Sequence, residues 1–171
     1  MRGWVAALVG IALMALSSGG AHAQWFYDQG EDDPFAGGSQ HLAMSLARSG
    51  ELIGFRCTSA DDLVLLFVSN EKPDPQQMAA MMLMPAKLLV IVDDASQQEF
   101  DASIEVTADG DRYRFSGEGD GLADVARAAS AAKKRFAVAA EMMGKRMYSA
   151  AVNVRGSGRA IGQLVKGCGL P

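Results

Sequence analysis

The 171-residue sequence has few of the residues on which catalytic and metal sites are commonly built. It contains two cysteines and two histidines, and neither a Cys-x-x-Cys nor a Gly-x-Ser-x-Gly motif. Once a signal peptide with His22 is removed, any Ser-His-Asp or Cys-His mechanism would depend on His41. His41 precedes an expected strand, where a surface histidine is the simpler interpretation. We therefore expect no catalytic residue, no cofactor and no enzymatic activity.

The sequence also lacks an excess of positive charge, since its net charge is −4. A net acidic chain has no reason to bind phosphate backbones, so nucleic acid is not an expected partner. The glycine-rich stretch at 117–121 carries acidic residues that would repel a phosphate, which disfavours nucleotide binding. With 49% hydrophobic and 21% charged residues, the composition is that of a globular protein.

Long apolar runs are absent beyond residue 23. The first 23 residues combine Arg2, an apolar run from Trp4 to Leu16 and an Ala-x-Ala site at 21–23, which is the pattern of a cleaved signal peptide. A retained N-terminal anchor is the less favoured alternative, because the run is shorter than the roughly 20 residues of a transmembrane helix. We expect a periplasmic or secreted protein that begins near Gln24 and has no later transmembrane segment.

The two cysteines are expected to pair in an oxidising compartment. Alternation over 51–57 places Cys57 on the inward face of a strand, and the spacing of apolar residues over 161–168 places Cys168 on the inward face of a helix. The sequence therefore predicts a disulfide between Cys57 and Cys168. Two buried free thiols are the alternative.

We expect an irregular N-terminal segment at 24–41 and a single α+β domain at 42–171. Alternating apolar residues and turn signals predict strands throughout this domain, and 63–68 and 87–93 are apolar on both faces, as in a covered sheet. The expected strands are 42–46, 52–57, 63–68, 87–93, 100–106, 112–115 and 148–154. The fold class is a mostly antiparallel curved sheet or β-sandwich with appended helices.

Three helices are expected in the same domain. Asp74 and Pro75 can begin a short helix that ends at Pro85. Apolar residues spaced by three and four from Leu122 to Met143 predict a long amphipathic helix. A short C-terminal helix is expected over 159–166, with Ser157 as its N-cap.

Methionines are the most distinctive candidates for function. Thioether ligands suit Cu(I), and the candidate ligands are His41, Met44, Met78, Met81 and Met82. Methionine surfaces also bind proteins, and the candidate residues for that role are Met78, Met81, Met82 and Met84. Packing of this stripe in the core, with part of it exposed, is the reading we favour.

Neighbouring carboxylates occur at Asp32-Asp33, Asp61-Asp62 and Asp93-Asp94. A glycosidase-like hydrolase requires two carboxylates across a cleft. Acidic residues at strand ends more often form turns, so we treat a hydrolase as the less favoured alternative.

Several stretches resemble a group of small exported bacterial proteins. These stretches are Leu52-x-x-Phe55-x-Cys57, the strand 88–92 followed by Asp93-Asp94, and Gly156-Ser157-x-x-Ala160-Ile161-x-x-Leu164-x-x-x-Cys168. Over residues 42–168 they look like the type VI secretion accessory proteins of the VasI/TagO kind and, more loosely, the invasion-associated locus B proteins. The resemblance implies an exported, non-enzymatic, β-rich domain with a Cys pair, and it carries over no catalytic residue. We expect a protein that works by binding another envelope or secreted protein.

Overall fold

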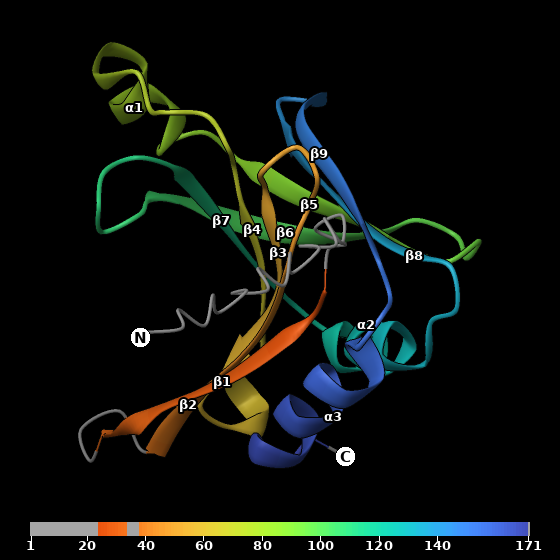
Figure 1. Ribbon diagram of the computed structural model, residues 1–171. Coiled ribbons are helices and arrows are strands. Elements are labelled where there is room, and N and C mark those ends of the chain that lie inside the picture. The colour runs from red at the N-terminus through yellow and green to blue at the C-terminus, as the bar shows by residue number, and fades with distance from the viewer. Residues whose placement is uncertain (1–23, 34–37, 171) are drawn as a thin grey trace, which may run out of the picture.

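Nine strands form one antiparallel sheet in the computed structural model, which describes residues 24–33 and 38–170. The strand order is β1-β2-β3-β4-β7-β6-β5-β8-β9, and the sheet curls into a half-barrel (Figure 1). The strands are β1 Phe26–Asp33, β2 Gly38–Leu46, β3 Leu52–Cys57, β4 Val64–Val68, β5 Ala86–Val92, β6 Gln98–Val106, β7 Tyr113–Glu118, β8 Arg135–Met142 and β9 Lys145–Asn153. The helices are η1 Ala60–Asp62, α1 Pro75–Met81, α2 Leu122–Ala131 and α3 Ser157–Gly167.

The expected α+β class with a curved, mostly antiparallel sheet is confirmed, as one sheet rather than a sandwich. The β2–β3 hairpin turns at Gly50, whose φ of 100° favours glycine. The short helix α1 begins as predicted, because the side chain of Asp74 accepts a hydrogen bond of 2.9 Å from the backbone N–H of Gln76. The signal-peptide prediction concerns residues 1–23, which lie outside the described residues.

The expectation of an irregular segment at 24–41 was wrong. Strand β1 and the first residues of β2 occupy it, and Phe26 pairs with Met44 in an antiparallel register. Glycines and acidic residues obscured the alternation, and pairing with β2 outweighs their low strand propensity.

The prediction of a long helix from Leu122 to Met143 was also wrong. Helix α2 ends at Ala131, and the chain continues as strand β8, whose inward residues recur every second position. In this alanine-rich stretch, spacings of three and four are compatible with either period. The carboxylate of Asp93 favours the strand over a continued helix, because it accepts hydrogen bonds from the backbone N–H groups of Lys133, Lys134 and Arg135, at 2.9, 2.7 and 3.0 Å.

The core fills the concave side of the half-barrel. Its fully buried rings are Phe55, Phe67, Phe115 and Phe136. Helices α2 and α3 lie against each other at one end of the half-barrel, and α1 lies at the other end (Figure 1). Apolar side chains of α2 and α3 join this core.

The first and last strands meet at one point through Trp25. Its backbone N–H donates to the carbonyl of Arg155 at 3.3 Å, and its indole Nε1–H donates to the carbonyl of Asn153 at 3.1 Å. The ring is buried and packs edge-on against Phe136. These contacts join the start of β1 to the end of β9, while among the described strands the rest of β9 pairs with β8 alone.

The predicted disulfide between Cys57 and Cys168 is confirmed. It joins the end of β3 to the C-cap of α3, with the two Cα atoms 6.1 Å apart. The helix itself starts earlier than expected, because Gly156, with a φ of 86°, is the N-cap. The bond closes a loop over a sequence separation of 111 residues and holds the last helix against the sheet.

Candidate functional site

The outer, convex face of β1–β4 carries a second apolar cluster that is separate from the core. We call it the outer-face cluster; its members are Leu42, Met44, Leu52, Val64, Leu66 and Val68. Strand β4 therefore buries both faces, as its sequence predicts. An antiparallel sheet usually presents polar side chains on a face that no second layer covers. The buried members of this cluster, Met44, Val64, Leu66 and Val68, are 3–7% exposed.

Cross-strand register extends the cluster to exposed side chains. Phe26 pairs with Met44, and Leu46 pairs with Leu52, so both add to the same face. Phe26 is 47% exposed and Leu46 is 49% exposed. The outer face of β1–β4 thus combines a buried apolar cluster with the exposed side chains of Phe26 and Leu46, and the exposed Asp28 lies on the same face opposite Leu42.

Gly54 sits in the middle of this surface, opposite Met44. A Cβ at Gly54 would stand 2.0 Å from the carbonyl oxygen of Ala43 and 2.9 Å from Cγ of Met44. The methionine side chain therefore lies over the glycine, which keeps the surface flat. Methionine has flexible torsions, so this part of the surface can adapt its shape.

A hollow of about 510 Å³ lies over this cluster, with arginines at its margins. Arg112 donates from Nη1 to the carbonyl of Gly50 at 3.1 Å. Arg114 forms a salt bridge with Glu105, while its Nε atom is buried without a hydrogen-bond partner. Arg56 also lines this hollow, which we call the apolar hollow.

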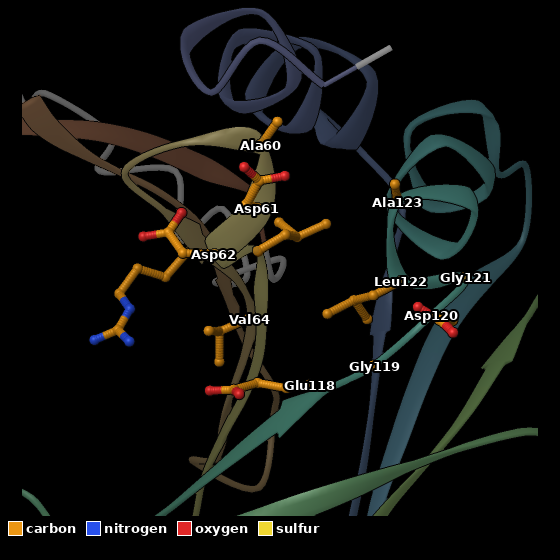
Figure 2. A pocket seen from close by; sticks show the side chains of 12 residues that line it. Ala60, Asp61, Asp62, Val64, Glu118, Gly119, Asp120, Gly121, Leu122 and Ala123 are labelled. Atoms are coloured by element: carbon orange, nitrogen blue, oxygen red, sulfur yellow. The ribbon is translucent and has the colours of Figure 1, made fainter. Parts of the chain in front are cut away.

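A second hollow, of about 600 Å³, adjoins it and is lined by acidic residues. Asp61 and Asp62 come from η1, whereas Glu118 and Asp120 come from the end of β7 and the loop before α2 (Figure 2). Arg56 lines both hollows. The four carboxylates give this acidic hollow a negative charge at a solvent-exposed surface.

Asp62 has a structural role in the acidic hollow. Partial burial disfavours its charged form, but hydrogen bonds from Thr58 and Ser59 outweigh burial and lower the pKa of its carboxyl. The backbone N–H groups of Thr58 and Ser59 lie 2.8 and 2.7 Å from its Oδ1. The carboxylate is thereby committed to the turn that leads into β4.

The carboxylates of Asp93 and Asp94 are engaged in structural contacts. Asp93 orders the start of β8, and hydrogen bonds from the backbone of Lys133, Lys134 and Arg135 lower the pKa of its carboxyl. Asp94 forms a salt bridge with Lys134. Asp32 and Asp33 lie in β1, and their side chains are outside the description.

The candidate methionines divide into two sets. Met78 and Met81 pack against the core at the α1 end of the half-barrel. Met82 is 45% exposed, Met84 is 36% exposed, and Leu83 between them is 88% exposed. This arrangement matches the reading in which part of the stripe packs inside and part remains accessible.

His41 is not brought together with the methionines. It is buried on the inner face of β2, where its Nδ1 lies 2.7 Å from the hydroxyl of Tyr27. A Cβ at Gly167 would be 2.5 Å from the imidazole ring, so α3 packs closely on it. Met44, three residues later in the same strand, belongs to the opposite face. Within the described ranges, no group of three or more His, Cys, Asp or Glu is placed to hold a metal ion.

The arginines of the apolar hollow and the exposed residues Phe26 and Leu46 were not among the sequence candidates. The sequence signal that pointed to this face of the sheet was strand β4, which is apolar on both faces. Arg56, Arg112 and Arg114 come from β3, from the turn before β7 and from β7, so only the strand register brings them together.

Comparison with family models, with curated proteins and with solved structures finds no match to this chain. In the described part of the chain, no helix has the length and apolar character needed to cross a bilayer.

Proposed function

We propose that this protein is an exported, non-enzymatic binding protein of the bacterial envelope, periplasmic or secreted, and an accessory to a secretion system. The observation that carries the binding role is the hollow of about 510 Å³ over the outer-face cluster, together with the exposed side chains of Phe26 and Leu46 at the edge of that cluster. Contiguous apolar patches on soluble proteins commonly mark interaction sites.

The neighbouring strands provide the contrast that supports this proposal. The outer face of β6 and β7 is polar, with Ser103 opposite Ser116 and Glu105 opposite Arg114. One sheet therefore carries an ordinary solvated face next to an apolar one. The apolar character stops at β6 and β7 and returns on the outer face of β5 and β8, where Leu89, Ile91, Ala137 and Ala139 line a smaller hollow of about 220 Å³.

Export is supported by the disulfide and by the expected signal peptide. Cys57 and Cys168 form a bond that is stable in oxidising compartments and rare in the cytosol. The resemblance to secretion accessory proteins supplies the envelope context. The purified native protein is expected to begin near Gln24, which an intact mass measurement would test; a mass that includes residues 1–23 would contradict export by cleavage.

The binding role is tested by site-specific photo-crosslinking in cells of the native host. A benzophenone amino acid replaces Leu46, and the same amino acid replaces Ser103 on the polar face as the matched control. We expect a discrete protein adduct from position 46 and none from position 103. The adduct should disappear when Phe26→Ser is added. Equal adducts from both positions, or none from either, would contradict a binding surface here.

The exposed residues after α1 form a second candidate surface for the same function. Met82, Leu83 and Met84 lie between α1 and β5. The first residue of β5, Ala86, pairs with Met142 at the start of the β8–β9 turn. Met143 and Met147 of that hairpin are also exposed, at 73% and 48%. The same crosslinker at position 83 would report a partner at this end of the half-barrel.

A further inference from the structure

Gln24 lies beside the N-terminus of helix α3. The next residue, Trp25, fixes this part of the chain, because its backbone N–H and its indole both donate hydrogen bonds to carbonyls at the end of β9. Gln24 is exposed, and its Cγ would lie 3.7 Å from a Cβ at Gly156, the N-cap of α3. A hollow of about 330 Å³ opens here, and Gln24, Gly156 and Arg159 are among the residues that line it. Residue 24 is therefore held at a defined place on the surface.

The surroundings of Gln24 carry positive charge. A helix has a partial positive charge on the free N–H groups of its first turn. Gly156 has no side-chain acceptor for these groups, so the N-cap does not offset that charge. Arg159 adds a full positive charge to the hollow, and no carboxylate is among the described residues that line it. An α-ammonium group on residue 24 would face these charges, so the uncharged amine is favoured at this place.

Cleavage after Ala23, which the proposed function expects, makes Gln24 the N-terminal residue. An N-terminal glutamine can react with itself, because its α-amino nitrogen reaches its own side-chain amide carbon in a five-membered ring. The amine is a nucleophile only in its uncharged form. Its attack forms the bond between the α-nitrogen and Cδ and breaks the bond between Cδ and Nε2. Ammonia leaves with the proton that the amine loses, so the reaction needs no oxidant, metal or second substrate.

Resting on the export by cleavage in the proposed function, we propose that Gln24 of the mature chain is a modification site and cyclises to pyroglutamate. The positive surroundings at the N-terminus of α3 promote the reaction by favouring the uncharged amine. The product is a neutral lactam, which places no charge next to Arg159 and adds a carbonyl acceptor beside the first turn of α3. The lactam also removes the α-amino group that an aminopeptidase needs. Trp25, which joins β1 to β9, is thereby protected from removal.

An intact mass of the protein purified from its native host tests the modification. We expect a chain that begins at Gln24 and lacks the mass of one ammonia. Gln24→Asn is the matched control, because its shorter side chain would require a strained four-membered ring, and it should keep its full mass. A chain that begins at Gln24 without the loss, or at another residue after the signal peptide, would overturn the modification and leave export intact. A mass that includes residues 1–23 would contradict both.

The rate of cyclisation tests the role of the α3 terminus. The full mature chain is released from a fusion by a protease that leaves Gln24 free, and the loss of ammonia is followed by mass at neutral pH. Arg159→Glu places a carboxylate in the hollow, and Arg146→Glu, an exposed arginine near the other end of β9, is the matched control. We expect cyclisation to be about threefold slower with Arg159→Glu and unchanged with Arg146→Glu. Equal rates in the two variants would overturn the promotion by the α3 terminus.

Discussion

Removal of the disulfide is expected to destabilise the fold by several kcal/mol. Cys57 and Cys168 are separated by 111 residues, and for a loop of that size the chain-entropy relation gives about 4.8 kcal/mol at room temperature. Both cysteines are buried, at 1% and 5% exposure, so alanine at each position leaves no side-chain polar group without a hydrogen-bond partner. The loss arises mainly because the unfolded chain gains freedom.

Urea unfolding of Cys57→Ala/Cys168→Ala measures this loss. With a slope of about 2 kcal/mol per M, the midpoint should fall by about 2 M. The native chain in a reductant should show the same fall, and the double variant should not respond to the reductant. A shift below about 0.3 M would refute the reasoning, because α3 would then be held by packing alone.

The remaining predictions concern the core, the methionines and acid stability, all measured by urea unfolding. Phe136→Ala should cost about 3–5 kcal/mol because its ring is fully buried, whereas Leu83→Ala should stay within about 0.5 kcal/mol. Met81→Ala should cost about 1–2 kcal/mol because it packs partly against the core, and Met82→Ala less than about 0.5. Equal effects of Met81→Ala and Met82→Ala would contradict that placement. The backbone hydrogen bonds that lower the pKa of Asp93 stabilise the fold above its ordinary value of 3.8, and this contribution is lost as the pH falls below that value through the lowered folded-state pKa. Asp93→Asn should therefore show a shallower loss of stability on acidification than the native chain, and identical slopes would refute this role.

Local signals in the sequence predicted the hairpins and the short helix. Gly50 and Gly110 mark turns between alternating strands, and Asp74 caps α1, because each of these depends on residues close in sequence. Strand β8 could not be predicted in this way. Its start is ordered by Asp93, about 40 residues earlier, and a helical period fits its alanines equally well.

The candidate site was predictable only in part. The apolar residues on both faces of β4 indicated a covered strand, but the sequence did not show whether this chain or a partner covers the outer face. Leu46 looked like an ordinary strand residue. Arg56 and Arg114 are 58 residues apart in the chain, and their relation depends on the β3–β4–β7 register, which includes the non-sequential β4–β7 pairing.

The hydrogen bond from Trp25 to Asn153 joins residues 128 positions apart, and it affects the order of events during folding. Strand β4 pairs with β7, and β5 pairs with β8. Several strands can therefore complete their pairing only after later segments of the chain have been synthesised. Pairing between distant segments slows folding. A chain that emerges with its N-terminus first can form its early hairpin, but the seam at Trp25 closes only when β9 is present. The complete sheet therefore forms only after the last strand is available, and its slowest step is the closure of this contact.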